Sequence, residues 1–143
     1  MHLLVVGMVL FPALLAAAPV ESLDEDHLRK RVEAFHQAFQ TQEFDTALGM
    51  YTEKARQRVI PSLSEEKRLK EEWRIFVEQN HPISTIKGIT LEGVRAIIKT
   101  DASIQLPNGN REHTELFDLW IFENGNWYFR TGNRTSPRFL PKD

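Results

Sequence analysis

Hydrophobic residues recur every three or four positions through the first half of the chain, and this spacing predicts three helices. The first runs for about four turns, and its apolar stripe is Leu28, Val32, Phe35 and Phe39. The second is shorter and runs from Phe44 to Tyr51. Residues 52–60 either extend it or form a loop before Pro61. The third helix ends before Pro82, and its stripe is Leu69, Trp73, Phe76 and Val77.

Two serines stand three residues before a glutamate at the predicted helix starts, Ser22 before Glu25 and Ser62 before Glu65. This spacing is typical of a capping box, in which the serine side chain accepts a hydrogen bond from a first-turn amide. We therefore expect Ser22 and Ser62 to begin the first and third helices.

In the second half of the chain the hydrophobic pattern changes to alternation, which predicts β-strands from Thr85 to Arg130. Three turn signals separate the alternating runs: Glu92-Gly93, Asn108-Gly109 and Asn124-Gly125. Asn-Gly favours two-residue hairpin turns because both central residues need a positive φ. The expected fold class is therefore α+β, with N-terminal helices packed on a curved antiparallel sheet of four or more strands.

A two-residue turn at Asn108-Gly109 sets the register of the central hairpin, with Ile98 opposite Leu119 and Lys99 opposite Asp118. Asp118 is then expected to form a cross-strand ion pair with Lys99 on the face away from the helices. The same register puts an aromatic cluster on that face, and a homodimer would cover it: Trp120, Phe122, Trp127 and Phe129. A slip of one residue would exchange the two faces.

The opening segment has no charged side chain in residues 1–20 and ends its apolar run in Ala16-Ala17-Ala18. It is shorter than the roughly 20 residues needed to span a bilayer and resembles a cleaved signal peptide. We expect a secreted or periplasmic protein with three parts: a signal peptide at 1–20, one domain at 22–131 and a C-terminal tail at 132–143. No membrane association beyond the signal segment is expected.

The composition excludes several classes of function. The net charge is −2 and the basic residues are not clustered, which argues against nucleic-acid binding. The chain has no cysteine, so disulfides, thiolate metal sites and thiol nucleophiles are excluded. The five histidines lack ligand-like spacing, and no cofactor motif is present, so neither a metal nor a cofactor is predicted.

The order of helices and strands, together with the aromatic run Trp120 to Phe129, resembles the nuclear transport factor 2-like (NTF2-like) superfamily. In that run an Asn-Gly turn joins two aromatic strands and the second restarts as Gly-x-Trp, while Glu92-Gly93-Val94-Arg95-Ala96 resembles an earlier hairpin of the group. The resemblance implies a cystatin-like α+β cone with a pocket between the helices and the bent sheet. Its members include isomerases, dehydratases, polyketide cyclases and binding modules.

For such a pocket the predicted register offers six polar candidates. Four are expected to contact a ligand: Tyr51, Thr100, Tyr128 and Arg130. His113 and Glu115 are two residues apart on one strand, so both side chains emerge on one face and are candidates for an acid–base pair. The alternative for this pair is an exposed position at the hairpin end.

The predicted register puts no acid in the middle of the helix-facing side, where an isomerase-like base would lie. The first hypothesis is therefore a non-catalytic secreted or periplasmic domain that binds a small apolar ligand or a protein partner. One alternative is an isomerase or hydro-lyase, similar to ketosteroid isomerase, that acts on a small organic molecule. Another is a structural homodimer.

Overall fold

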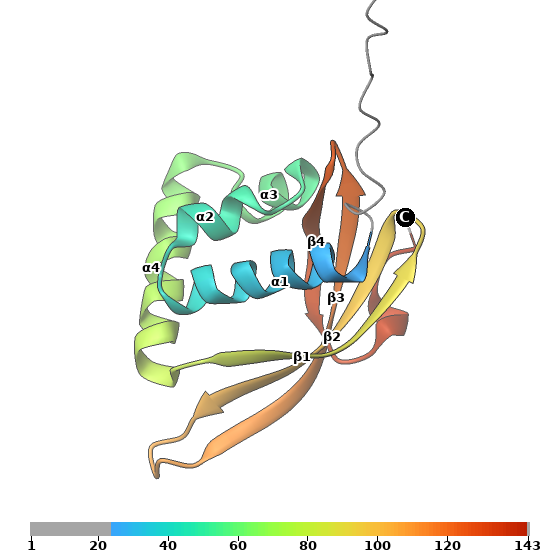
Figure 1. Ribbon diagram of the computed structural model, residues 1–143. Coiled ribbons are helices and arrows are strands. Elements are labelled where there is room, and N and C mark those ends of the chain that lie inside the picture. Colours follow the sequence, from blue (N-terminus) through green and yellow to red (C-terminus); the bar gives the residue numbers. More distant parts are fainter. Residues whose placement is uncertain (1–23, 143) are drawn as a thin grey trace, which may run out of the picture.

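The computed structural model describes residues 24–142, which form four helices on one side of a four-stranded antiparallel sheet (Figure 1). The helices are α1 (Glu25–Gln40), α2 (Phe44–Gly49), α3 (Glu53–Val59) and α4 (Leu63–Asn80). The strands follow in chain order as β1 (Ile83–Glu92), β2 (Arg95–Gln105), β3 (Arg111–Glu123) and β4 (Asn126–Arg134). A short 3₁₀ helix, η2, spans Pro137–Phe139. The predicted α+β class is confirmed.

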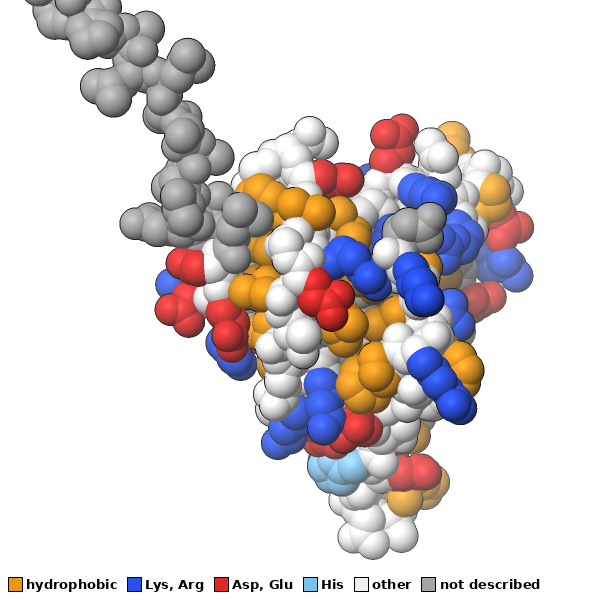
Figure 2. Space-filling model, turned by 90° about the vertical axis from the view of Figure 1, so that its right-hand side faces the viewer, with side chains coloured by type: hydrophobic (Ala, Val, Ile, Leu, Met, Phe, Trp, Pro, Cys, Tyr) orange, Lys and Arg blue, Asp and Glu red, His pale blue; other side chains and the backbone are white. Residues whose placement is uncertain are grey.

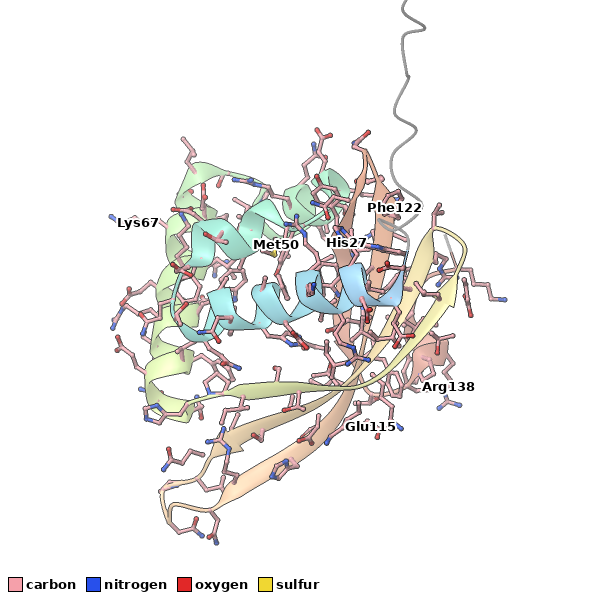
Figure 3. The ribbon with its side chains drawn as sticks, in the orientation of Figure 1. His27, Met50, Lys67, Glu115, Phe122 and Arg138 are labelled. Carbon is pink, nitrogen blue, oxygen red and sulfur yellow. The ribbon has the colours of Figure 1, made fainter. Side chains whose placement is uncertain are left out.

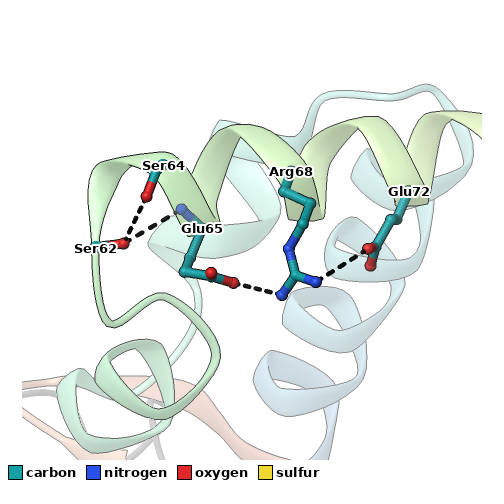
Figure 4. Close-up of polar contacts among 5 residues, drawn as sticks. All are labelled: Ser62, Ser64, Glu65, Arg68 and Glu72. Carbon is teal, nitrogen blue, oxygen red and sulfur yellow. Dashed lines mark hydrogen bonds and ion pairs between the residues drawn. The ribbon is translucent and has the colours of Figure 1, made fainter.

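The helix starts differ in part from the prediction. Asp24 caps α1 by accepting a 2.7 Å hydrogen bond from the His27 backbone N–H, while Ser22 and the predicted signal peptide lie outside the described residues. Residues 53–59 are neither an extension nor a loop but a separate helix, because the Thr52 hydroxyl caps it. Ser62 caps α4 as predicted, although the Glu65 side chain pairs with Arg68 (Figure 4).

The three hairpins show how turn chemistry sets register. Asn124 and Gly125 both have positive φ, 51° and 79°, and form the predicted two-residue turn between β3 and β4. Gly93 and Val94, rather than Glu92 and Gly93, connect β1 to β2, because Glu92 pairs with Arg95. This shift of two residues leaves the faces of residues 88–92 unchanged, whereas a register irregularity between Ile86 and Gly88 exchanges the faces of the earlier residues of β1.

The central turn differs from the prediction by one residue, and Pro107 is the physical reason. Proline fixes φ near −65°, which suits the first central position of a type I turn. The Gly109 N–H donates to the Leu106 carbonyl (2.9 Å), and Gly109 itself has a φ of 84°. The loop is therefore the three-residue hairpin in which a left-handed glycine follows a type I turn, and the Leu106 N–H donates to the Asn110 carbonyl (2.7 Å).

This one-residue difference exchanges the faces of β3 and β4 relative to β2. Ile98 lies opposite Asp118 rather than Leu119, and Lys99 lies opposite Phe117. The predicted Lys99–Asp118 ion pair is therefore wrong, and Lys99 instead pairs with Glu115 (3.3 Å). Asp118 faces the helices.

The hydrophobic core lies between α1 and this corrected sheet face. Leu28 and Val32 of α1 are fully buried against Ala96 and Ile98 and against Trp120 and Trp127, which are 0% exposed. Phe122 and Phe129 pack on the same cluster. The predicted dimer interface of Trp120, Phe122, Trp127 and Phe129 is therefore wrong, because these side chains lie in the hydrophobic core or pack against it.

The opposite face of the sheet is partly covered by the end of the chain. Leu140 is buried, and the Arg95 guanidinium donates a 2.6 Å hydrogen bond to the Pro141 carbonyl. The segment predicted as a C-terminal tail thus packs on the sheet, and β4 itself continues to Arg134. On the side of the molecule away from α4, hydrophobic side chains lie among Lys, Arg, Asp and Glu (Figure 2).

Candidate functional site

A pocket of about 490 Å³ lies between the helices and the sheet face that carries Asp118. Its walls are mainly aromatic and come from α1, the α2–α3 connection, α4 and β4: Phe35, Phe39, Tyr51, Trp73, Phe76 and Phe129. Its polar lining consists of His36, Gln40, Ser84, Thr100, Ser103, Glu112, Thr114, Asp118 and Asn133. Among these, Thr100, Ser103 and Asp118 are buried. This combination of apolar walls and a few buried polar groups is typical of a small-molecule site.

Backbone hydrogen bonds hold one wall of the pocket. The Thr52 N–H donates to the Phe129 carbonyl (2.8 Å), and the Phe129 N–H donates to the Met50 carbonyl (2.7 Å). Tyr51 is thereby joined to β4, and its ring lies 4.8 Å from the Phe129 ring, centroid to centroid. The ring of Phe35 stacks on Phe129 from α1, with a centroid distance of 5.2 Å.

Side-chain packing holds the opposite wall, which is formed by α4. Trp73 meets Phe39 and Phe44 edge-on or tilted, at centroid distances of 5.3 and 5.6 Å. At the surface, Lys70 forms an ion pair with Asp45. Two residues of the apolar stripe of the third predicted helix, Trp73 and Phe76, thus line the pocket and do not pack into a closed core.

Asp118 is positioned by a bulge in the β3–β4 ladder. Phe117 pairs with Arg134 and Leu119 with Thr131, so two residues of β4, Gly132 and Asn133, lie opposite Asp118 alone. The Asn133 N–H donates a 2.9 Å hydrogen bond to Asp118 Oδ1. A side chain at position 132 would overlap with the carboxyl and would lie 2.7 Å from Phe129 Cε2, so only glycine fits.

Burial changes the acid–base properties of three lining residues. Asp118 is 7% exposed, and burial raises the pKa of its carboxyl to about 6, while the Asn133 N–H opposes this rise. Burial lowers the pKa of His36 to about 4. Burial and the Asp118 charge together raise the pKa of Tyr51 to about 12. At neutral pH, Asp118 is therefore mostly ionised, whereas His36 and Tyr51 are uncharged.

Known structures share this architecture. RPA3114 from Rhodopseudomonas palustris, which contains a SEC-C motif, aligns with a TM-score of 0.60 at 15% identity over 74% of this chain and 77% of its own. An NTF2 protein designated Rd1NTF2_05 aligns with a TM-score of 0.56 at 16% identity over 73% of this chain and 94% of its own. This protein has the NTF2-like fold. The predicted resemblance is confirmed at the level of fold.

The NTF2-like fold does not by itself select an activity. AclR from Streptomyces galilaeus, a hydroxylase candidate, also aligns, with a TM-score of 0.52 at 12% identity over 83% of this chain and 91% of its own. No protein-family model and no curated protein matches this sequence. The site itself must therefore carry the functional argument.

Within the NTF2-like pocket, two of the predicted ligand contacts are present and two are not. Tyr51 and Thr100 line the pocket, and their role in binding stays a prediction. Tyr128 and Arg130 lie outside the lining. The Tyr128 ring instead contacts the Arg31 guanidinium, which lies 5.5 Å from the ring centroid, and Arg130 is buried.

His113 and Glu115 share one face of β3, as predicted, but it is the face away from the pocket. The His113 Nδ1 atom lies 2.9 Å from Asp101 Oδ2, and Glu115 projects from the sheet on the side opposite the helices (Figure 3). Both residues are exposed. The expectation that they face the helices is therefore wrong, since the central register differs by one residue.

Sequence reasoning missed Asp118 and His36 as pocket residues. The signal that would have placed Asp118 in the pocket is Pro107, which favours a three-residue loop and so turns Asp118 inward. His36 has no such signal, because it lies at the flank of the α1 stripe and becomes buried only through the tertiary packing of α1 on the sheet.

Residues 24–142 contain neither a membrane-spanning helix nor a cluster of metal ligands. No described helix is both long and apolar enough to cross a bilayer. Within the same residues, no three or more His, Asp or Glu side chains are grouped so that they could hold a metal ion.

Proposed function

We propose that this protein binds a small, mainly apolar molecule in the pocket between its helices and sheet. The observation that carries the proposal is the pocket of about 490 Å³, which has aromatic walls and a buried carboxyl on its floor. Pockets of roughly 300–1,000 Å³ hold small organic molecules and cofactors. The aromatic rings would bury the apolar body of the ligand, and Asp118 would contact a polar group.

The test introduces a bulky side chain at the floor of the pocket. Ala102 lines the pocket and is half-buried, so Ala102→Phe puts a ring into the space that a ligand would occupy. Native mass spectrometry of the wild-type chain, expressed from Glu21, should show an additional small mass that Ala102→Phe abolishes. Ala34→Phe is the matched control, because Ala34 is exposed on α1. A bound mass that survives Ala102→Phe would refute binding at this site.

A second candidate is an enzyme that moves a proton on such a ligand, as an isomerase or hydro-lyase does. The specific observation in its favour is Asp118, because a buried carboxyl with a pKa of about 6 can accept a proton at neutral pH. The Tyr51 hydroxyl, which stays protonated, could donate a hydrogen bond to an oxygen that gains charge. The expectation that the helix-facing side carries no acid in its middle is wrong, because Asp118 faces the helices there.

Proton transfer can be measured without knowing the natural substrate. Deuterium uptake at the carbon next to the carbonyl of α-tetralone, followed by NMR, should be accelerated by the wild type and should fall about 10²- to 10⁴-fold in Asp118→Asn. Glu115→Gln, on the opposite face, is the control. If α-tetralone binds but the wild type does not accelerate exchange above the buffer rate, the ligand-binding function stands and this catalytic candidate does not.

We also propose that the chain is secreted or periplasmic after removal of its first residues. The support is the apolar, uncharged opening segment with its small-residue end. N-terminal sequencing of the exported protein should find a start between residues 18 and 22. Homodimerisation stays a prediction, and it no longer has support from the aromatic residues, which belong to the core.

A further inference from the structure

Among residues 24–142, two carboxyl groups and no Lys or Arg line the pocket. Asp118 lies on the floor, and Glu112 lies on the same face of β3. The other polar lining groups are amides, hydroxyls and His36, whose pKa is lowered to about 4, so they are uncharged at neutral pH. Arg111 donates to one lining residue, Ser103 (2.9 Å to Oγ), but does not itself line the pocket. The charges of the lining are therefore negative only.

Asp118 has no counter-ion, and one of its oxygens is open to the pocket. It forms no ion pair with any Lys or Arg of residues 24–142. The Asn133 N–H donates to Oδ1, whereas Oδ2 accepts no hydrogen bond from the described chain. Oδ2 is also not among the inaccessible polar atoms of this part of the chain that lack a partner, so a ligand in the pocket can reach it. Burial without a counter-ion disfavours the carboxylate, and a cation in the pocket would offset that cost.

Three aromatic rings of the pocket wall lie close to this carboxyl. The Phe129 ring is beside it, because a side chain at position 132 would overlap with both. The Tyr51 and Phe35 rings contact Phe129 at centroid distances of 4.8 and 5.2 Å, and the Asp118 charge acts on the Tyr51 hydroxyl. Aromatic rings attract cations through the negative faces of their π-systems. The carboxylate and the rings therefore favour the same ligand group, a positive charge on an apolar body.

We propose that Asp118 and the rings beside it recognise a protonated amine carried by a mainly apolar molecule. The ammonium N–H donates to Asp118 Oδ2, and the apolar body of the ligand contacts the aromatic walls. Glu112 is exposed, so it lies where the pocket opens to solvent and attracts cations toward it. This inference rests on the proposed ligand-binding function and specifies its ligand class.

Three probes that share a phenyl ring and a four-carbon chain test the inference by isothermal titration calorimetry at pH 7: 4-phenylbutylamine, 4-phenylbutanol and 4-phenylbutyrate. The wild type should bind the amine about ten- to hundredfold more tightly than the alcohol, because hydrogen bonds between charged groups are stronger than neutral ones. The anionic 4-phenylbutyrate should bind least tightly. Asp118→Asn keeps the shape of the side chain and should reduce the advantage of the amine to less than about threefold.

Two control variants locate the effect at Asp118. Glu112→Gln removes the other carboxyl of the lining, and because that group is exposed and screened, the advantage of the amine should change by less than about threefold. Glu115→Gln lies on the outer face of the sheet and should leave all three affinities unchanged. A preference for the amine that disappears in Glu112→Gln but persists in Asp118→Asn would overturn the inference.

A second measurement uses the wild type, so it does not depend on the folding of a variant. Between pH 7 and pH 5 the Asp118 carboxyl, whose pKa is about 6, takes up a proton, while the amine stays charged. His36 and Tyr51, with pKa values of about 4 and about 12, stay mostly uncharged over this range. The affinity for the amine should therefore fall about tenfold from pH 7 to pH 5, and that for the alcohol should not. The same titration of Glu112→Gln removes any contribution of Glu112, and an amine affinity that is equal at both pH values would contradict the role of Asp118.

The outcomes distinguish this inference from the function beneath it. If the alcohol or 4-phenylbutyrate binds the wild type as tightly as the amine, the amine site is overturned while ligand binding stands. If none of the three probes binds, the amine site is overturned, and native mass spectrometry then decides the proposed function. An additional mass that Ala102→Phe abolishes would leave that function standing, and the absence of such a mass would overturn it as well.

Discussion

The buried Asp118 carboxyl should make the stability of this protein depend on pH in a predictable direction. A carboxyl whose pKa is higher in the folded state binds its proton more tightly there than in the unfolded chain. Folding is therefore favoured when Asp118 is protonated, and this contribution is lost as the pH rises from about 4 to about 6. Asp118→Asn removes this titration and keeps the shape of the side chain.

The magnitude follows from the two pKa values. A rise from 3.8 to about 6 corresponds to about 3 kcal/mol. The free energy of unfolding of Asp118→Asn, minus that of the wild type, should therefore increase by about 3 kcal/mol between pH 3 and pH 7, with most of the change between pH 4 and pH 6. Taking the difference cancels the titration of His36, which is common to both proteins. Burial and the Asp118 charge raise the pKa of Tyr51 to about 12, so Tyr51 stays protonated over this range in either protein.

Urea unfolding followed by tryptophan fluorescence at constant ionic strength measures both proteins from pH 3 to pH 7. Asp45→Asn is the control, because the Asp45 carboxylate is 84% exposed and its ion pair with Lys70 lies at the surface. This control should change by less than about 1 kcal/mol over the same range. A difference between Asp118→Asn and the wild type that is flat across the range would refute the assignment of Asp118 as a buried group with a raised pKa.

Two further substitutions test local geometry. Gly132→Ala should displace the Asp118 carboxyl, because the added methyl would overlap with it; we expect a loss of about 1–3 kcal/mol in stability and an altered Asp118 pKa by NMR titration, whereas Gly49→Ala, where the methyl meets no atom within 4 Å, should leave that pKa unchanged. Ser62→Ala should cost about 1 kcal/mol in urea unfolding because the α4 cap is lost. Ser64→Ala, which keeps the Ser62–Glu65 bond, should cost less, and equal losses would contradict the capping role of Ser62.

The helices and the fold class could be predicted from the sequence because their determinants are local. The apolar stripe through Leu28 and Val32 requires only helical periodicity, and it does face the core. The Asn124-Gly125 turn was likewise predicted correctly, since both residues adopt the positive φ that this turn needs. Periodicity alone does not identify α3 at residues 53–59, because its start depends on one residue, the cap Thr52, rather than on a repeating pattern.

The candidate site could not be predicted to the same extent, because it depends on register. Pro107 favours a three-residue central loop, and the resulting register differs from the predicted one. Asp118 therefore faces the pocket rather than the outer face, and His113 and Glu115 lie on the outer face rather than facing the helices. Burial raises the pKa of Asp118, while the Asn133 N–H of the β4 bulge opposes this rise, and the strand pattern does not show that bulge. Tyr51 and Thr100 were placed correctly because β2 and the helices keep their predicted faces.

The two walls of the pocket are held by different interactions. We therefore expect the α4 wall, but not the β4 wall, to adjust to ligands of different size. β4 is tied to the α2–α3 connection by directional backbone bonds at Phe129, which break if the strand shifts. α4 packs through the Trp73 ring, and ring contacts can slide by a fraction of a side chain without a polar group losing its partner. A family of ligands of different lengths would therefore share one orientation against β4 and differ where they meet α4.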